Sequence, residues 1–327
     1  MFKNKEAAME RIRKGQKGQN PVTVLGAGTM GHGLALLAAR AGHGVWLVDL
    51  EEQALRKARE LLEAETQWLE AQGELGGLGA QDVLRLIRTT RSLEESLEDS
   101  VLILEAVSED VSVKRRLYEA VAPKLSPKAI LASNTSYLDV FSIAPEELLQ
   151  RFLIAHFYAP PHLIPLVEVV PSPKTSSGVV EELLELLRSW GQKPVLMKKF
   201  IPGYIVNRLQ RAMAREIFHL LDEGYATPEQ IDEAVKASLG IRIPVVGVVQ
   251  RYDFTGLDLA LKFLGNPSIQ LVNEDRVPAS LMEKVKAGDL GVKTGRGFYV
   301  YTNSSTAETL LERDRRLLYL RRFLESL

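Results

Sequence analysis

Three glycines and one acid within residues 22–50 have the types and spacing of a nucleotide site. Gly26, Gly28 and Gly31 follow a short β-branched run and precede an apolar pattern of helical spacing. In such a turn, the successive glycines permit a tight bend, a close backbone approach to a pyrophosphate and close packing of the helix. The remaining residues of the loop are Ala27, Thr29 and Met30. The pattern predicts a strand, a phosphate-binding turn and a helix whose first N–H groups face a dinucleotide.

Asp49 lies at the end of the next apolar run, which reads GVWLVDL and predicts a second buried strand. A carboxylate at this point can accept hydrogen bonds from the ribose hydroxyls and would repel a 2′-phosphate. We therefore expect NAD, not NADP, as the cofactor. The alternative is a glycine-rich turn followed by a surface acid, and the strand–turn–helix–strand order favours the nucleotide site.

His156 and Glu168 have side chains suited to moving a proton. His156 lies near the carboxyl end of the predicted strand FLIAHFYAP, and Glu168 lies on the following predicted strand, LVEVV. Neutral imidazole can take a hydroxyl proton near pH 7, and a carboxylate on its other nitrogen would stabilise the resulting imidazolium. By themselves these residues also fit a structural histidine within a strand. His162, in a proline-rich loop, is a rival base.

Further polar residues have both a chemical and a structural interpretation. Ser136 could bond a substrate oxygen or merely cap its own loop. Asn207, on a predicted helix, could donate to a substrate carbonyl or pack at an interface. Glu109 and Lys114, considered alone, would be a charge pair on a solvated helix face.

The elements that must position these side chains alternate between strands and helices. From 21 to 198, short apolar runs are separated by helical patterns, which predicts a Rossmann-like, doubly wound, mainly parallel sheet. After residue 200 the strand patterns nearly disappear. We expect an α/β fold with an all-helical second domain, divided into an N-terminal arm (1–20), an NAD-binding domain (21–200), a helical C-terminal domain (201–301) and a C-terminal helix (302–327).

Composition excludes several classes of function. The formal net charge of the 327-residue chain is −1, which gives no strong field for nucleic acid or an anionic membrane. No apolar run reaches the roughly 20 residues that span a bilayer. The chain has no cysteine, which rules out disulfides and thiolate metal sites and fits a reducing, cytoplasmic setting. We expect no metal, and we expect the basic N-terminal arm to be a helical or disordered lead-in, not a targeting signal.

Several separate motifs resemble the L-3-hydroxyacyl-CoA dehydrogenase family. They are GAGTMG, EAVSEDVSVK, SNTS, AHF followed by PLVEVV, PGYIVNRL and GVKTGRGFY, and they extend over about 21–301. The resemblance implies a Rossmann-like NAD domain and a helical domain that forms a homodimer. It also implies a cytoplasmic oxidoreductase of fatty acid metabolism.

The resemblance assigns roles to individual residues of this chain. His156 and Glu168 match the catalytic dyad of the family. Ser136 and Asn207 match the other catalytic positions of the family, where they would bond the substrate, and this match favours the catalytic interpretation over the structural one. Glu109 and Lys114 match positions near the nicotinamide ribose, so they join the glycine loop and Asp49 as expected cofactor contacts.

The sequence departs from the family pattern in two places. The family usually reads HFFNP after the catalytic histidine, whereas this chain reads HFYAP, with Ala159 in place of the asparagine. The segment expected to hold the CoA moiety has Glu65 and Gln72 where the family has a serine and a lysine. Between Arg59 and Arg85 there is no basic residue. A carboxylate near the negative charges of CoA would lower affinity for it.

These observations leave three functions open. The first is NAD-dependent interconversion of a short-chain L-3-hydroxyacyl-CoA and its 3-oxo form, which we expect from the sequence. The second is dehydrogenation of a small CoA-free 3-hydroxy acid or polar alcohol, because EAQGELGGLGAQDVLRLI and PPHLIPLVEVVP resemble the lambda-crystallin and L-gulonate 3-dehydrogenase branch. The third is a non-enzymatic dinucleotide-binding protein, against which the complete set of Ser136, His156, Glu168 and Asn207 argues.

Overall fold

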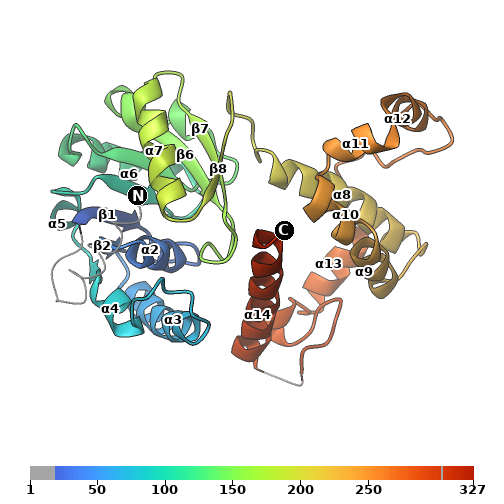
Figure 1. Ribbon diagram of the computed structural model, residues 1–327, viewed down its shortest axis with the longest axis horizontal. Coiled ribbons are helices and arrows are strands. Elements are labelled where there is room, and N and C mark those ends of the chain that lie inside the picture. The colour runs from blue at the N-terminus through green and yellow to red at the C-terminus, as the bar shows by residue number, and fades with distance from the viewer. Residues whose placement is uncertain (1–18, 303–304) are drawn as a thin grey trace. The chain divides into compact units, whose positions relative to one another are not determined.

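The computed structural model describes residues 19–302 and 305–327 (Figure 1). The chain divides into two compact units between Ile205 and Val206, and each unit is described by itself. The N-terminal arm expected at 1–20 lies almost entirely outside the described residues.

The first unit is built on one sheet of eight strands within the described residues. The strand order is β3-β2-β1-β4-β5-β6-β7-β8, and every neighbouring pair is parallel except β6 and β7. This confirms the expected doubly wound, mainly parallel sheet. The strands are β1 (Gln19–Leu25), β2 (His43–Val48), β3 (Ile87–Thr90), β4 (Leu102–Glu105), β5 (Ile130–Ser133), β6 (Phe152–Phe157), β7 (Leu166–Pro171) and β8 (Lys193–Leu196).

Helices connect the parallel strands of the first unit. They are α2 (Gly31–Arg40), α3 (Glu52–Ala71), α4 (Ala80–Arg85), α5 (Leu93–Leu97), α6 (Val111–Val121) and α7 (Ser177–Ser189). The helix α2 packs against both β2 and α3, and every residue from Gly31 to Ala39 is buried (Figure 1). Its small and apolar sequence suits a helix that is covered on all sides. Asp110 caps α6 by accepting from the N–H groups of Ser112 and Val113.

The strand order reverses at β1, which pairs with β2 on one side and with β4 on the other. In open α/β sheets, ligands bind beyond the carboxyl ends of the strands at such a reversal. The glycine loop follows β1 at this point. All residues of β4, β5 and β6 are buried, so side chains at their carboxyl ends have a rigid support.

The strand β3 is the element that the sequence analysis missed. Its four residues, IRTT, contain a single apolar side chain, and none of them is fully buried. A short, polar strand at the edge of a sheet carries little of the apolar pattern by which strands are predicted. Helices α3 and α4, which precede β3, lie on either side of a glycine-rich segment.

The second unit is helical, as expected. Its helices are α8 (Val206–Asp222), α9 (Pro228–Ala237), α10 (Leu239–Val246), α11 (Gln250–Thr255), α12 (Leu257–Leu264), α13 (Ala279–Lys286) and α14 (Thr306–Glu325). Thr227 and Gln230 form a capping box at the start of α9. Among its described residues, β pairing is limited to isolated bridges between 291 and 300.

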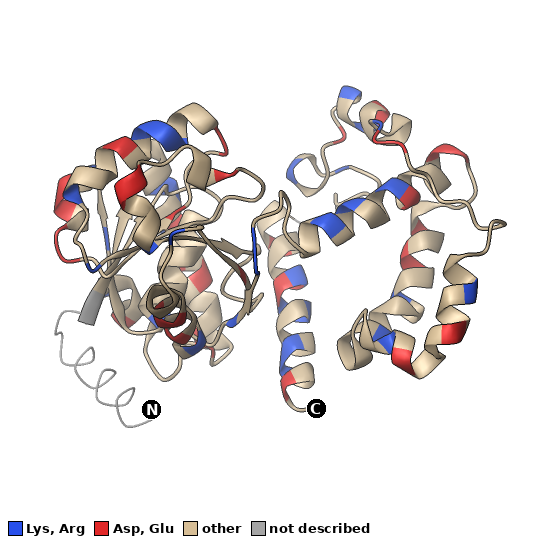
Figure 2. Ribbon diagram, turned by 90° about the horizontal axis from the view of Figure 1, so that it is seen from above, with Lys and Arg blue, Asp and Glu red and all other residues tan. Residues whose placement is uncertain are grey.

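Charged residues of both signs are interspersed over the helices of each unit (Figure 2). This distribution is consistent with the net charge of −1. In the part of the chain that the structure describes, the helices lack the combined length and apolar character that crossing a bilayer requires.

Candidate active site

The glycine loop has the local geometry that its sequence predicts. Gly26 adopts a φ of +100°, and a Cβ there would lie 2.6 Å from the carbonyl oxygen of Ala106. A Cβ on Gly31 would lie 1.8 Å from the carbonyl oxygen of Gly26. Gly28 has no neighbouring atom within 4 Å of the place where its Cβ would be. Two of the glycines are therefore required by the fold itself, and the third leaves open space beside the backbone.

Asp49 is joined to the glycine loop by a hydrogen bond. Its Oδ2 accepts from the backbone N–H of Ala27 at 2.8 Å, and its Oδ1 accepts from Glu51 at 3.0 Å. The turn after β1 and the acid after β2 thus lie side by side at the carboxyl edge of the sheet. Met30 is the N-cap residue of α2, so this helix begins directly behind the loop. This arrangement fits a dinucleotide whose phosphates meet the helix N-terminus.

His156 and Glu168 face each other across the antiparallel pair of strands. They are direct partners in the register of β6 and β7. The imidazole Nδ1 and the carboxylate Oε2 are 3.1 Å apart, and 4% of His156 and 0% of Glu168 is exposed. Because Glu168 engages Nδ1, the other ring nitrogen, Nε2, is the atom that can exchange a proton with a substrate. The geometry is that of a base oriented by a carboxylate.

Two tyrosine rings pack against the imidazole. The ring of Tyr158 lies 4.6 Å from that of His156, and its hydroxyl donates to Glu168 Oε2 at 2.7 Å. The ring of Tyr204 lies 5.0 Å from that of His156, and its hydroxyl donates to the carbonyl oxygen of Thr135 at 2.7 Å. The backbone N–H of Ile205 donates to Glu168 Oε1 at 2.9 Å. The dyad is thus buried and held in place by hydrogen bonds and ring contacts.

The SNTS segment is tied to the same region. Asn134 Oδ1 accepts from the N–H of Phe157 at 2.8 Å, next to His156, and Thr135 bonds Tyr204 as described above. Glu109 Oε1 accepts from the N–H of Ser136 at 2.6 Å. The backbone of Ser136 is therefore fixed by Glu109, and its neighbours Asn134 and Thr135 bond residues next to or packed on the dyad.

A buried network of charges lies beneath this segment. Lys114 Nζ donates to Glu105 Oε1 at 2.7 Å and lies 3.3 Å from Glu109 Oε2. The hydroxyls of Tyr118 and Ser133 donate to the other oxygen of Glu105, at 2.7 and 2.5 Å. Only 1% of Lys114 and 0% of Glu105 is exposed. The interpretation of Lys114 as part of a solvated helix face is therefore wrong, because the helix α6 turns it inward.

Glu109 remains ionised at the rim of this network. Burial alone would raise the pKa of its carboxyl group. Hydrogen bonds from Thr135, Ser136 and Tyr137 and the charge of Lys114 outweigh that effect and lower the pKa. Lys114 thus links the fully buried Glu105 to a carboxylate that holds the Ser136 loop. Sequence reasoning missed Glu105, although it stands at the end of a predicted strand.

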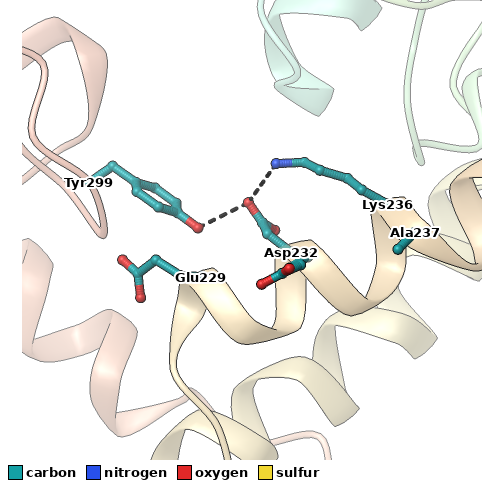
Figure 3. A pocket seen from close by; sticks show the side chains of 6 residues that line it. Glu229, Asp232, Lys236, Ala237 and Tyr299 are labelled. Carbon is teal, nitrogen blue, oxygen red and sulfur yellow. Dashed lines mark hydrogen bonds and ion pairs between the residues drawn. The ribbon is translucent and has the colours of Figure 1, made fainter.

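Asn207 lies in the first turn of α8, at the start of the second unit. Its substrate contact therefore stays a prediction. A pocket of about 550 Å³ in this unit is lined by Glu229, Asp232, Lys236 and Tyr299 among others, with Tyr299 and Lys236 both reaching Asp232 (Figure 3). It contains none of the residues expected to act, and we assign it no part in the chemistry.

Comparison with known proteins places these features in one family. Residues 21–200 match the family described as 3-hydroxyacyl-CoA dehydrogenase, NAD binding domain, and residues 203–301 match its C-terminal domain. The chain belongs to the 3-hydroxyacyl-CoA dehydrogenase family. It is consequently an NAD-dependent oxidoreductase.

Relatives within the 3-hydroxyacyl-CoA dehydrogenase family differ in their substrates. The mitochondrial hydroxyacyl-coenzyme A dehydrogenase of Homo sapiens is 35% identical over 86% of this chain and 90% of its own length. The human lambda-crystallin homolog is 33% identical over 70% of this chain and 72% of its own. A solved structure of 5-formyl-3-hydroxy-2-methylpyridine 4-carboxylic acid 5-dehydrogenase is 32% identical, covers 94% of this chain and 98% of that chain, and has a TM-score of 0.83.

One departure from the family pattern lies beside the dyad. Ala159 is exposed and precedes Pro160 across a cis peptide bond. Its methyl group offers no hydrogen bond to the loop or to the cofactor, unlike the asparagine of the family pattern. Gly33 on α2 accommodates the turn that follows, because a Cβ at Gly33 would lie 2.7 Å from the ring of Pro161.

The second departure, Glu65, faces two histidines. Glu65 Oε1 lies 3.2 Å from His32 Nε2, and Glu65 Oε2 lies 3.9 Å from His162 Nδ1. The other nitrogen of His32 faces the carbonyl oxygen of Gly28 at 3.0 Å. Burial lowers the pKa of His32, but the hydrogen bond and charge of Glu65, with Gly28, outweigh it and raise the pKa. His162 is therefore placed beside Glu65, and the contact of His32 with Glu65 was not predicted from the sequence.

Proposed function

We propose that this protein oxidises a hydroxyl group of a small, CoA-free hydroxy acid with NAD, and catalyses the reverse reduction. The observation that carries this proposal is the buried pair of His156 and Glu168 at the carboxyl edge of the sheet. The pair belongs to the same unit as the glycine loop, which fits an NAD-binding turn. A dinucleotide-binding protein without catalysis would have no need of an oriented base.

Each residue of the proposed site has a separate role in the reaction. His156 Nε2 takes the hydroxyl proton during oxidation and returns it during reduction. Glu168 fixes the tautomer through Nδ1 and stabilises the charged imidazolium. The hydroxyl of Ser136 holds the reacting oxygen by a hydrogen bond, and Asn207 is proposed as a substrate contact only from its match to the family position. Bound NAD supplies the hydride acceptor, and its reduced form supplies the donor.

The cofactor is proposed to lie over Gly28, with contacts to the loop, Asp49 and the Glu109–Lys114 region. The Gly28→Ala variant should fold normally, because nothing lies within 4 Å of the added Cβ. It should weaken NAD binding by about tenfold or more, since the methyl group would occupy the space of the pyrophosphate. Quenching of protein fluorescence on titration with NAD gives the dissociation constant.

Gly31→Ala is the matched comparison for this prediction. Its Cβ would collide with Gly26 at 1.8 Å, so we expect a loss of folding stability along with NAD binding. If Gly28→Ala binds NAD as tightly as the unmodified protein, the cofactor does not approach this turn.

The charge of the helix pair α3 and α4 favours a substrate without CoA. Residues 60–84 include six carboxylates, at Glu60, Glu63, Glu65, Glu70, Glu74 and Asp82, and no lysine or arginine. The resemblance to the family would place the CoA moiety along this segment, where its phosphates would meet like charge. The relative with a TM-score of 0.83 is named for a pyridine carboxylate. Both observations support a small acid as the substrate.

A short-chain L-3-hydroxyacyl-CoA is the second candidate. The identity of 35% to human hydroxyacyl-coenzyme A dehydrogenase favours it, and so does the pairing of Glu65 with His32, which offsets one carboxylate. On this reading the enzyme belongs to fatty acid metabolism.

A panel of substrates separates the two candidates. NADH absorbance would be followed with acetoacetyl-CoA, with free acetoacetate, with L-gulonate plus NAD, and with 5-formyl-3-hydroxy-2-methylpyridine 4-carboxylate plus NAD. We expect kcat/KM for at least one free acid to exceed that for the thioester by about tenfold or more. Turnover of acetoacetyl-CoA alone would establish the second candidate. Tight NAD binding without turnover of any 3-oxo or hydroxy compound would contradict both.

The second unit also supports a proposal about assembly. Apolar side chains stand out from its helices, and Phe254 and Leu261 are each 75% exposed. Apolar surface on this scale usually marks a protein interface. We propose a homodimer formed through this unit, in a cytoplasmic setting consistent with the absence of cysteine.

A further inference from the structure

Tyr158 contacts the catalytic pair in a way that neither its sequence motif nor the proposed chemistry explains. The residue follows His156 by two positions, directly after the end of β6, so its side chain lies on the same side of the sheet as that of His156. Its hydroxyl donates to Glu168 Oε2 at 2.7 Å, and His156 Nδ1 lies 3.1 Å from that same oxygen. One carboxylate oxygen is therefore shared between the imidazole and a phenol.

We propose that Tyr158 is a positioning residue that sets the proton affinity of His156 through Glu168. This inference rests on the proposed function, because it assigns Tyr158 a part in the same reaction. A hydrogen bond donated to a carboxylate withdraws charge from it, and charge-assisted bonds of this kind are among the stronger ones in proteins. With less charge on Oε2, the carboxylate stabilises the imidazolium less.

The surroundings of the carboxylate strengthen this effect. Glu168 is fully buried, so water does not screen the difference that one hydroxyl makes. Ile205 N–H holds the other oxygen, Oε1, at 2.9 Å, which fixes the orientation of the carboxylate. The charged or titratable groups that these contacts place beside the imidazole are Glu168 on β7, Tyr158 after β6, and Tyr204.

The direction of the effect follows from the chemistry. Without the phenol hydroxyl, Glu168 carries more charge at Oε2 and holds the imidazolium more tightly. Oxidation requires neutral imidazole, so the oxidation rate falls at low pH. Without the phenol hydroxyl, this acidic limb of the pH profile should move to higher pH. Reduction requires imidazolium, so its alkaline limb should move to higher pH as well. A residue that only supports the fold would lower the rate at every pH and leave both limbs in place.

The test is Tyr158→Phe, with Tyr204→Phe as the matched control. Phenylalanine stands at this position in the family pattern HFFNP, so the first variant is expected to fold. Tyr204 also packs on His156, but its hydroxyl bonds Thr135 and not Glu168. In Tyr158→Phe we expect both limbs of kcat/KM to rise by about 0.5–1 pH unit, part of the strength of a charge-assisted hydrogen bond. In Tyr204→Phe the limbs should stay where they are in the unmodified enzyme.

A second readout does not depend on substrate. The imidazole of His156 can be titrated by NMR in the NAD-bound protein, with His156→Gln to assign its signal among the five histidines. Its midpoint should rise in Tyr158→Phe by the same amount as the kinetic limbs. A midpoint that moves no further than in Tyr204→Phe would overturn the role of Tyr158. If the unmodified enzyme turns over no hydroxy or oxo acid while this midpoint shifts, the proposed function fails and the coupling of Tyr158 to the dyad stands.

Discussion

Replacing His156 with glutamine should reduce turnover by about a thousandfold and leave NAD binding nearly intact. General bases contribute roughly 10²–10⁴ in rate, and the neutral amide of glutamine can form a hydrogen bond but cannot take a proton. His156 is only 4% exposed and lies opposite Glu168 on the neighbouring strand, so a substitute of similar size is needed to preserve the packing. Stopped assays of NADH formation at saturating substrate give kcat, and fluorescence titration with NAD gives the dissociation constant.

His162→Gln is the matched control for this prediction. His162 is equally buried but faces Glu65, so its loss should change kcat only slightly. A kcat of His156→Gln within about threefold of that of the unmodified enzyme would show that His156 is not the general base. A loss of turnover in His162→Gln as large as in His156→Gln would make His162 the better assignment.

Replacing Lys114 with methionine should lower the free energy of unfolding of the first unit by about 3–5 kcal/mol. Removing one partner of a buried ion pair leaves the other charge without compensation. Here the abandoned partner is Glu105, which is 0% exposed and has only hydroxyl and backbone donors left around it. Urea unfolding followed by tryptophan fluorescence reports on this unit alone, because Trp46, Trp68 and Trp190 all lie within it.

Lys124→Met provides the comparison for Lys114→Met. Lys124 pairs with Glu94 at the surface, and exposed pairs contribute about 0–1 kcal/mol. The double variant Lys114→Met with Glu105→Gln should recover part of the lost free energy of unfolding, because the uncompensated charge of Glu105 is removed. Equal free energies of unfolding of the Lys114→Met and Lys124→Met variants would show that the buried ion pair of Lys114 and Glu105 does not stabilise the first unit more than a surface pair does.

Much of the first unit could be predicted from sequence because its signals are local. The glycine turn, the apolar strands and the helices between them each show in a short window. The tight approach of Gly31 to Gly26 shows why the spacing of the loop is so informative. The pairing of His156 with Glu168 followed from their places on successive strands, although only the antiparallel register makes them direct partners.

The contacts that escaped prediction join residues far apart in the chain. Lys114 has the pattern of a surface residue, but α6 turns it towards Glu105, and nothing in the sequence indicates that Glu65 lies beside His32. Such networks depend on how each helix is rotated about its axis when it packs on the sheet. This rotation cannot be predicted from a short stretch of the sequence. The polar strand β3 was missed because it lacks an apolar pattern of its own.

A crystal structure with NAD and a hydroxy acid bound would test most directly whether His156 is the base that takes the substrate proton. We expect Nε2 of His156 to lie within hydrogen-bond distance of the substrate hydroxyl, whose carbon faces the nicotinamide, while Nδ1 keeps its hydrogen bond to Glu168. An imidazole that points away from the nicotinamide, or that is separated from the substrate by other side chains, would contradict the proposed chemistry.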